Sequence, residues 1–246
     1  MLRYQGILVT QYYDTSSLEF RKCRFMCGRF TLSHLAEAIA STFQLSTIPA
    51  IKPRYNIAPT QLIPTILPTD TGDRQLRMLR WGLIPSWAKD PAMGAKLINA
   101  RSETVAEKPS FRSAFRHRRC LVIADGFYEW QRQEGKKQPF YFRLQNQQPF
   151  AFAGLWEHWQ DPKGEIINSC TILTTQANEL LQSIHDRMPV ILNTKDYDLW
   201  LDPTVQKPEQ LQHLLQPFSP EAMISYPVST KVNNPGNDTA ECINSL

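Results

Sequence analysis

The chain of 246 residues is long enough for one large domain or two small ones, and its 42% apolar and 20% charged residues are ordinary for a soluble globular protein. No apolar run approaches the roughly 20 residues that a membrane helix needs, so we expect no membrane partner. A net charge of +4 is only mildly basic, which permits an acidic partner without requiring one.

The cysteines are odd in number and scattered along the chain, which argues against a disulfide framework. No CxxC pair predicts zinc. A reducing cytoplasm is the simplest compartment, and we expect no metal and no cofactor. The cysteines are Cys23, Cys27, Cys120, Cys170 and Cys242.

Residues 1–25 do not resemble a signal peptide, because the apolar stretch 6–9 is too short and acidic side chains occur soon after it. They also lack a helical or strand periodicity. We expect them to form an N-terminal extension outside the folded domain, which we assign to residues 27–246.

A methionine typical of a translation start, Met26, is followed at once by Cys27. Without Met26 and everything before it, Cys27 would carry a free α-amine two carbons from its thiol. Such a 1,2-aminothiol condenses with an aldehyde to an imine, and the thiol then closes a five-membered thiazolidine. On its own, a Met-Cys pair is usually just two buried side chains, so the rest of the chain must decide.

The first elements of the domain are predicted from apolar spacing and from proline content. Apolar residues recur at helical intervals over residues 32–43, and Ser33 is a candidate cap for that helix. The stretch 49–68 is interrupted by prolines and predicts an irregular loop.

Short strand-like runs occupy the middle of the chain. Residues 121–124 are continuously apolar, which predicts a strand buried on both faces. The aromatic runs 140–142 and 150–152 flank a polar turn and predict a hairpin. Residues 166–175 read as another strand.

The last third alternates short helices and strands. We expect a helix over 177–184, a strand over 188–192, helical stretches over 194–201 and 208–214, and a strand over 224–228. Because the strands cluster without regular helical crossovers, the pattern predicts one α+β domain rather than a doubly wound parallel sheet.

Two segments place ionisable side chains among apolar ones. Glu129 ends the buried strand between Tyr128 and Trp130, where an unpaired carboxylate is costly or has a raised pKa. It is either a structural glutamate paired with an arginine or a proton-transfer group. His185 precedes Asp186, which leaves open a structural role or acid/base work near neutral pH.

Three further groups keep a structural and a functional interpretation. Asn99 and Arg101 follow an apolar pair, so Asn99 can be a structural hydrogen-bonding residue and Arg101 can pair with Glu103. Trp87 belongs either to the core or, beside arginines, to a base-stacking surface. The basic run 112–119 is either a solvated face or a phosphate-binding surface.

Seven short segments, in this order, resemble the SOS response-associated peptidase (SRAP) family, the abasic-site processing proteins. The resemblance extends from Cys27 to about residue 243. The segments are Cys27-Gly28-Arg29-Phe30, Arg54-Tyr55-Asn56-Ile57-Ala58-Pro59, Trp81-Gly82-Leu83-Ile84-Pro85, Ile98-Asn99-Ala100-Arg101-Ser102-Glu103, Asp125-Gly126-Phe127-Tyr128-Glu129-Trp130, His185-Asp186-Arg187-Met188-Pro189 and Val232-Asn233-Asn234-Pro235.

The resemblance implies a single α+β domain built around a curved, mostly antiparallel, barrel-like sheet with flanking helices and a positively charged cleft. It implies a nucleophile at Cys27, with Asn99, Glu129 and His185 completing the catalytic site. It further implies a DNA-damage (SOS) protein that binds single-stranded DNA and becomes covalently attached to its abasic sites. We expect a monomer whose DNA contacts come from Arg29, Asn56, Trp87, Arg101, Trp130 and Thr174.

The sequence departs from the family pattern at its start. In relatives the cysteine directly follows the initiator methionine, whereas 25 residues precede Met26 here. Either translation begins at Met26 or the extension is cleaved, and we favour the first. The peptidase label points to removal of the residues before the cysteine.

Three further interpretations of the function remain open on the sequence. Without sulfur attack, the imine can undergo β-elimination and cut the strand, which is abasic-site lyase activity. Cys27, His185 and Glu129 or Asn99 could also form a Cys/His peptidase acting on other proteins, although the local cysteine signatures of such enzymes are missing. A non-catalytic reader of modified single-stranded DNA is the third interpretation.

Overall fold

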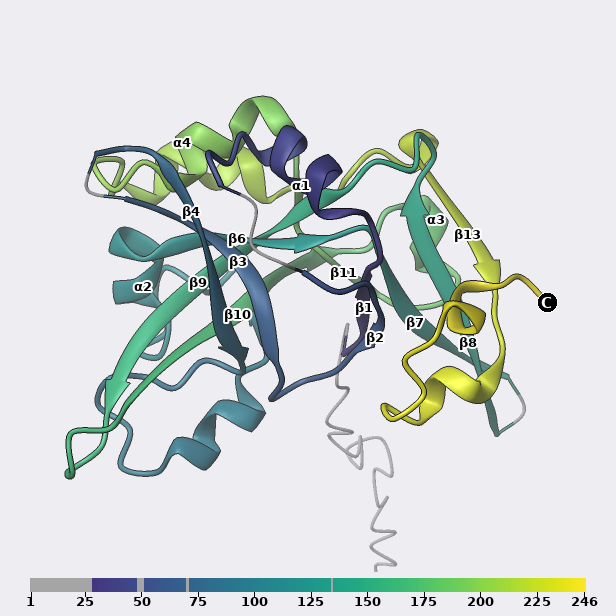
Figure 1. Cartoon of the computed structure of the whole chain (residues 1–246), viewed down its shortest axis with the longest axis horizontal. Helices are drawn as coiled ribbons and strands as arrows, with labels where there is room; N and C mark the ends of the chain where they lie inside the picture. The colour runs from purple at the N-terminus through teal and green to yellow at the C-terminus, as the bar shows by residue number, and fades with distance from the viewer. Residues whose placement is uncertain (1–27, 48–50, 70, 134) are drawn as a thin grey trace, which may run out of the picture.

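The computed structural model describes residues 28–47, 51–69, 71–133 and 135–246. These residues form a mixed α+β domain with two sheets, labelled in Figure 1. Among them, no helix is both long and apolar enough to cross a membrane. The expected extension 1–25 and Cys27 lie outside the described residues.

Sheet A contains five antiparallel strands in the order β13-β8-β7-β1-β2. The middle position of β7 matters for the site, because β7 pairs with β8 on one side and with β1 on the other. The strands are β1 (Phe30–Leu32), β2 (Arg54–Ile57), β7 (Gly126–Gln133), β8 (Lys136–Leu144) and β13 (Met223–Pro227).

Five strands of the second sheet close into a barrel, because β10 pairs with both β4 and β9. The order around the barrel is β10-β4-β3-β6-β9, and only the β10–β4 pair among these is parallel. The fold is therefore the α+β, barrel-like architecture that the sequence predicts. The barrel strands are β3 (Leu62–Pro68), β4 (Arg74–Trp81), β6 (Arg119–Ala124), β9 (Phe150–Gln160) and β10 (Ile166–Gln176), with β5 (Asn99–Arg101), β11 (Arg187–Pro189) and β12 (Ile191–Leu192) paired at its edges.

The helices are short and lie around the two sheets, with α1 and α4 above the barrel in the view of Figure 1. The α-helices are α1 (Ala36–Phe43), α2 (Arg112–His117), α3 (Glu179–Gln182) and α4 (Tyr197–Leu201). The 3₁₀ turns are η2 (Pro91–Lys96), η3 (Thr194–Asp196), η4 (Pro208–Gln210), η5 (Gln212–Leu215), η6 (Pro220–Ala222), η7 (Thr230–Asn233) and η8 (Ala240–Ile243).

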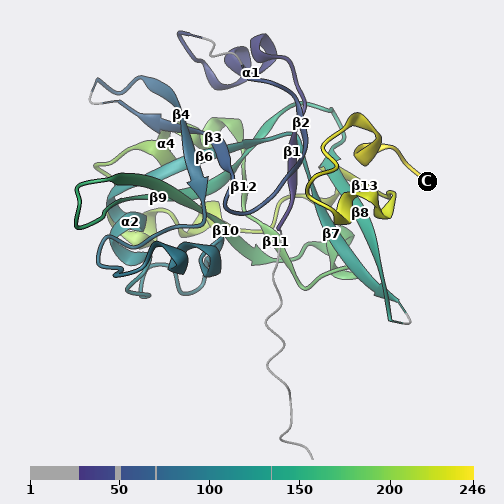
Figure 2. The ribbon, with the colours of Figure 1, turned by 60° about the horizontal axis from the view of Figure 1, so that its bottom comes forward.

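Strand β1 lies where sheet A meets the barrel, as Figure 2 shows. Its first residue, Phe30, is 1% exposed. The Phe30 ring packs edge-on against Trp81 of β4 and Phe152 of β9, with centroids 5.2 and 5.9 Å apart. Burying three aromatic rings together is strongly favourable. The start of the domain is thus fixed against the barrel core.

The loop expected over residues 49–68 is wrong, because the structure forms β2 and β3 there. Proline lacks the N–H that a strand donates, and it is tolerated where no partner needs that donor. β3 pairs with β6 only through Thr65 and Ile66, so Pro64 and Pro68 fall outside that ladder.

The hairpin expected between 140–142 and 150–152 is also wrong. Both runs are strands, but β8 belongs to sheet A and β9 to the barrel. β8 pairs with β7, and β9 pairs with β10, so the hairpins are one strand earlier and one strand later. The polar turn between β8 and β9 is a crossing between sheets.

Other predicted elements differ in their bounds. The buried strand over 121–124 is confirmed by β6, all of whose residues are buried. The strand over 166–175 is confirmed by β10, and the strand over 224–228 by β13. The strand over 188–192 is interrupted, since β11 and β12 pair with different strands.

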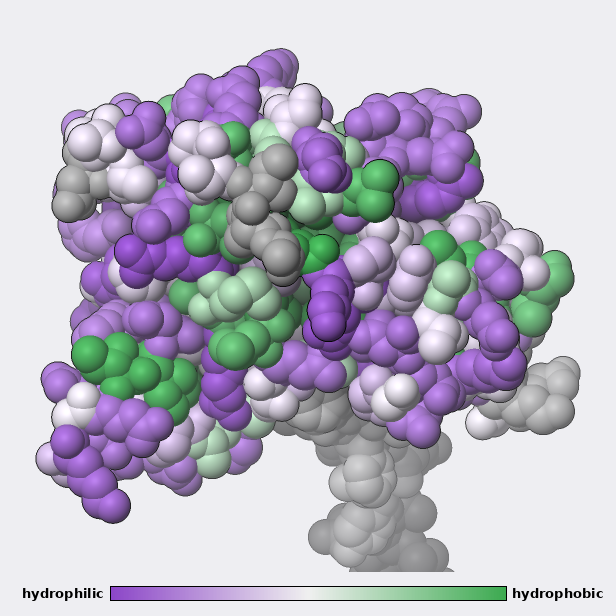
Figure 3. Space-filling model, in the orientation of Figure 1, coloured by the Kyte–Doolittle hydropathy of each residue, from purple (hydrophilic) through white to green (hydrophobic). Residues whose placement is uncertain are grey.

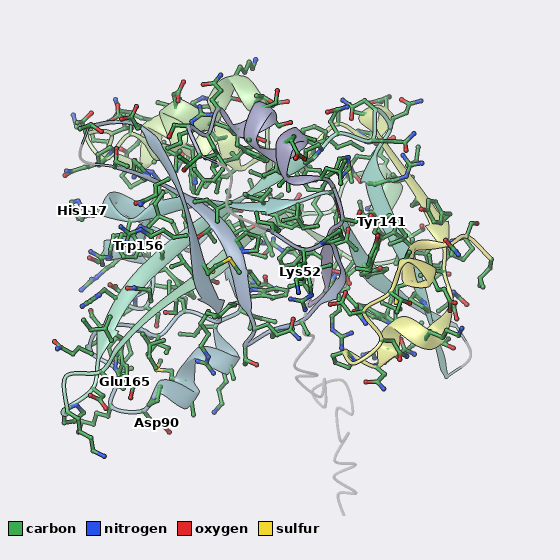
Figure 4. The ribbon with its side chains drawn as sticks, viewed as in Figure 1. Lys52, Asp90, His117, Tyr141, Trp156 and Glu165 are labelled. Carbon is green, nitrogen blue, oxygen red and sulfur yellow. The ribbon has the colours of Figure 1, made fainter. Side chains whose placement is uncertain are left out.

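Ser33 does not cap the first helix. α1 begins at Ala36 without a side-chain cap, while Ser33 donates both its N–H and its hydroxyl to Asp125. Asp125, at the β6–β7 corner, also accepts from Thr31 and from the His34 backbone and ring. Tyr141, labelled in Figure 4, lies with its hydroxyl 2.9 Å from Thr31 Oγ1. This network connects the end of β1 to the start of β7.

Candidate functional site

A pocket of about 420 Å³ lies beside β7, against the segment that leads from α3 to β11. Glu129 and Trp130 line it from β7, and His185 and Asp186 line it from the facing segment. The structure therefore brings two of the predicted catalytic residues and one predicted DNA contact into one cavity. α3 is shorter than the helix predicted over 177–184, which leaves residues 183–186 as loop.

Glu129 is 3% exposed, as its position in an apolar strand predicts. It pairs across sheet A with Phe140 of β8. Its carboxylate is therefore shielded from bulk water, although the residue lines the pocket. This is the setting in which carboxyl groups transfer protons to or from a substrate.

His185 has a neighbour for each protonation state of its Nδ1 atom. The backbone N–H of Arg187 donates to Nδ1 at 3.0 Å, which requires a lone pair on that nitrogen. Oδ1 of Asp186 also lies 3.0 Å from Nδ1, where it can accept from a protonated ring. In a neutral ring, the bond from Arg187 therefore leaves the proton on Nε2.

The first described residues lie antiparallel to β7, and their N-terminal end is the end nearer the pocket. β1 is antiparallel to β7, with Phe30 opposite Phe127. One step earlier, the N–H of Tyr128 donates to the carbonyl of Arg29 at 3.0 Å. If this register continued by one residue, Gly28 would come level with Glu129.

Three other predicted residues lie together on the barrel edge. β5 is parallel to β10, which sets Asn99 beside Ile172 and Arg101 beside Thr174. Asn99 is half-buried and Arg101 is exposed. Thr174, expected to contact DNA, is fully buried, and its carbonyl accepts from Arg187 Nη2 at 2.6 Å.

Arg187 connects this barrel edge to the pocket. Its guanidinium pairs with Glu103 through two nitrogens, and its backbone N–H holds the His185 ring. Arg101 is exposed, and the carboxylate of Glu103 pairs with Arg187. The pairing of Arg101 with Glu103 that the sequence allows is therefore not the main contact of that carboxylate. Hydrogen bonding to Arg187 lowers the pKa of Glu103 against the opposing effect of burial.

Arg29 and Asn56, expected to contact DNA, contact the chain itself. Asn56 is fully buried, so its amide has no exposed atom for a phosphate. Arg29 Nη1 donates to Asn56 Oδ1 at 2.9 Å and to the carbonyl of Val232 at 2.8 Å. Burial lowers the pKa of Arg29, with Tyr128 opposing that effect.

Trp87 lies apart from the residues of the pocket wall. Its side chain is 57% exposed on the loop between β4 and η2, an unusual position for a tryptophan unless a partner covers it. Trp81, at the end of β4, is instead fully buried and donates to the carbonyl of Ile98 at 2.9 Å.

The basic run 112–119 divides between surface and core. Arg112, Arg116 and His117 are exposed on α2, and Figure 4 shows His117 at the outer edge of the barrel. Arg119 is 3% exposed and donates only to backbone carbonyls. Burial lowers the pKa of Arg119 to about 10, against the effect of Asp202.

Sequence reasoning did not single out two cations that line the pocket, Arg132 and Lys137. They lie directly opposite each other on β7 and β8, and both are exposed. Like charges in directly opposed positions repel, so an anion between them is favourable. Side chains alternate between the two faces of the β7–β8 hairpin, so the strand register shows that these two cations share a face.

Other depressions in the described residues differ in their lining. One of about 390 Å³ is lined mainly by aliphatic side chains, among them Leu32, Ile57, Leu62 and Met78. Hydrophobic surface gathers near the centre of the face shown in Figure 3. No group of three or more His, Cys, Asp or Glu side chains suited to a metal ion occurs in the part of the chain that the structure describes.

Comparisons with known proteins agree with this fold and with the seven segments of the sequence. Residues 26–235 match the family described as SOS response associated peptidase (SRAP). The chain is 48% identical over 224 residues to abasic site processing protein YoqW of Bacillus subtilis, covering 89% of this chain and 100% of YoqW. It is 36% identical over 222 residues to abasic site processing protein HMCES of Xenopus tropicalis, covering 78% of this chain and 66% of HMCES.

A solved structure of a Bacteroides thetaiotaomicron protein superimposes with a TM-score of 0.80 at 27% identity. It covers 89% of this chain and 100% of that protein. The chain belongs to the SRAP family.

Proposed function

We propose that this protein processes abasic sites in single-stranded DNA by attaching to them through Cys27. The similarity to YoqW and HMCES, both named abasic site processing proteins, supports abasic sites as the substrate. The observation that carries the proposal is the β1–β7 register, in which Arg29 lies beside Tyr128, one residue before Glu129 in the pocket wall. Cys27 is joined to Gly28 by one peptide bond, which separates Cα atoms by about 3.8 Å.

The chemistry needs a free amine and thiol on one residue. An abasic site is mostly a closed hemiacetal with a small fraction of open aldehyde. The Cys27 amine adds to the aldehyde and releases water as the imine forms. The thiol then adds across the C=N bond, with the sulfur bonding to carbon and the proton passing to nitrogen, which closes the thiazolidine.

An α-amine suits this step because its usual pKa is about 7.7–8.0, so much of it is unprotonated near neutrality. A lysine amine, at about 10.4, is almost entirely protonated there. Holding amine and aldehyde together in the pocket converts the addition into an effectively intramolecular step.

The pocket residues take the proton-transfer roles. His185 protonates the sugar ring oxygen as the hemiacetal opens, because its Nδ1 has a partner in both protonation states. Glu129 moves protons during imine formation and orients the amine. Asn99, on the neighbouring barrel edge, donates to a sugar or aldehyde oxygen. If the thiol does not add, β-elimination from the imine gives lyase activity.

DNA contacts come from side chains that line this pocket and from others outside it. Arg101, Arg132 and Lys137 bind phosphates, and Trp130 and Trp87 stack on neighbouring bases. Arg29 is half-buried and stays a proposed phosphate contact, whereas Asn56 and Thr174 are fully buried and would act by holding the backbone around the site.

The proposal requires a mature chain that begins at Cys27. Translation from Met26 followed by removal of the methionine meets this requirement, and we favour it over cleavage of a longer chain. Intact mass spectrometry of the protein expressed from its natural locus distinguishes a chain starting at Cys27 from one that retains residues 1–26.

The decisive test is attachment to an oligonucleotide with one abasic site. We expect a heat-stable protein–DNA band for the natural chain and none for Cys27→Ser. That variant retains an imine that borohydride traps, because serine still supplies the amine. Cys170→Ala, at a free cysteine buried in the barrel, is the matched control and should attach fully. A heat-stable band of normal intensity with Cys27→Ser would refute ring closure by the thiol.

The family description also contains a peptidase, so a Cys/His protease acting on other proteins is the second candidate. Acetylation of the α-amine separates the two. It abolishes attachment to abasic DNA but spares an ordinary thiol protease, which needs no free amine. Cleavage of an added peptide by acetylated protein would favour the protease.

A further inference from the structure

Hydrogen bonds to β2 hold residues 232–238, which comprise the end of η7 and the loop that follows it. Asn56 is fully buried on β2, and the two N–H groups of its side-chain amide are shared among the carbonyls of Val232, Asn234 and Asn237, at 3.1, 3.0 and 2.8 Å from Nδ2. Asp238 in turn accepts from the backbone N–H of Asn56 at 2.9 Å. One buried amide thus fixes the path of the whole loop.

Arg29 fastens the same loop to β1. Its Nη1 atom bridges Asn56 Oδ1 and the Val232 carbonyl, and its Nη2 atom donates to the Asn233 carbonyl at 3.4 Å. The backbone on both sides of Asn233 is therefore held by groups from sheet A. The Asn233 side chain is exposed, but the backbone that carries it is held in place.

The Asn233 side chain reaches the pocket wall. Its Oδ1 atom accepts from Trp130 Nε1 at 2.7 Å. An indole has one N–H, so a hydrogen bond to a fixed acceptor defines the rotation of the ring plane. Trp130 is half-buried, lines the pocket with Glu129, and rests against the Tyr128 ring at 6.4 Å between centroids.

We propose that Asn233 is a positioning residue that holds the Trp130 indole as a stacking platform for the nucleobase next to the abasic site. This inference rests on the proposed function and deepens it. An abasic nucleotide has no base, so binding energy must come from the backbone and from neighbouring bases. A ring held at one angle stacks without the loss of rotational freedom that a mobile ring incurs.

The test compares two oligonucleotides that carry a tetrahydrofuran in place of the abasic sugar, which lacks the aldehyde and measures binding alone. The first has ordinary bases on both sides of the tetrahydrofuran, and the second has tetrahydrofuran at those two neighbouring positions as well. We expect Asn233→Ala to weaken binding to the first about 5- to 10-fold and binding to the second by less than 2-fold. Asn244→Ala, another exposed asparagine near the chain end, should leave both unchanged.

Two further variants distinguish positioning from loss of structure. Asn233→Asp keeps the acceptor atom, so it restores the ratio between the two affinities although its charge weakens both. In a Trp130→Phe background, which has a ring but no N–H, Asn233→Ala should cause no further loss. An equal loss on both oligonucleotides, or a full additional loss in Trp130→Phe, would overturn the inference.

These outcomes separate the inference from the proposed function. Base-dependent binding through Asn233, combined with a heat-stable band from Cys27→Ser, supports the positioning role and contradicts thiazolidine attachment. Normal attachment through Cys27, combined with no effect of Asn233→Ala on either oligonucleotide, contradicts the positioning role and leaves the proposed function standing.

Discussion

Glu129 and His185 line one pocket although β7 of sheet A supplies the first and the loop between α3 and β11 supplies the second. Neither segment makes a site alone. The pocket exists only when sheet A and the barrel edge are both in place, which explains why the two residues lie so far apart in the sequence.

Replacing Glu129 or His185, the two residues proposed to transfer protons, should slow attachment to abasic DNA without preventing binding. We expect Glu129→Gln and His185→Ala each to lower the attachment rate about 10²- to 10⁴-fold, the usual contribution of general acid/base catalysis. Affinity for a tetrahydrofuran oligonucleotide should change by less than 3-fold, roughly. Glu157→Gln, at a buried carboxylate that pairs with Arg118, is the control for rate. A large loss of affinity would reassign Glu129 or His185 to binding.

Binding to single-stranded DNA should weaken steeply with salt, because phosphate contacts release counterions. We expect Arg132→Gln to reduce the slope of log affinity against log salt by about 0.7, the value for one phosphate contact on a single strand. Lys163→Gln removes the same charge at the turn between β9 and β10 and should leave the slope unchanged. A slope that Arg132→Gln does not alter would remove this residue from the DNA surface.

The stability of the fold should depend on the His34–Asp125 pair. The hydrogen bond to Asp125 raises the pKa of His34 above its usual 6.5, so its stabilising effect is complete below pH 6.5 and is lost as the pH rises through the raised value. Burial acts to raise the pKa of Asp125, but hydrogen bonds from His34 and its neighbours hold it below 3.8. Its contribution is therefore lost only as the pH falls through that lowered value.

We accordingly expect the melting temperature to fall as the pH is raised from 6 to 8, roughly. His34→Asn keeps a donor for Asp125 but cannot titrate, so it should flatten this decline. His117→Asn, at an exposed histidine on α2, should preserve it. A decline of the same size in His34→Asn would show that another group titrates.

Arg119 should be essential for stability rather than for DNA binding. Its guanidinium donates to the carbonyls of Phe115, Arg116, Trp200 and Asp202, which Arg119→Met would leave without this donor. At about 1–3 kcal/mol for each unsatisfied buried group, we expect a loss of about 3 kcal/mol or more in the free energy of unfolding. Chemical denaturation measures it.

Arg116→Met is the matched control, three positions earlier in the same basic run and exposed. It should change the free energy of unfolding by no more than about 0.5 kcal/mol. Equal losses for the two variants would contradict the division of this run between surface and core.

The sequence predicts those elements whose side chains show one clear period. β6 is continuously apolar because it is covered on both faces, and β10 is long enough to be recognised alone. β3 is not predicted, because its prolines are residues that local sequence rules assign to loops. They are acceptable because Pro64 and Pro68 fall outside the ladder with β6, which is a tertiary property.

The pairing of strands is likewise beyond local inference. The aromatic runs of β8 and β9 predict a hairpin, yet they join different sheets because each finds a better partner in β7 or β10. The burial of Glu129 follows from its neighbours in the sequence. The burial of Asn56 does not, because the carbonyls that it satisfies come from the far end of the chain.

The order of the strands has a consequence for synthesis on the ribosome. Every strand of the closed barrel lies between Leu62 and Gln176, whereas sheet A awaits β13, which begins at Met223. The barrel can therefore close while the last segments are still inside the exit tunnel. A nascent chain arrested once Gln176 has left the tunnel, but before β13 has, would have a complete barrel beside an unfinished sheet, with β8 exposing an unpaired edge until β13 emerges.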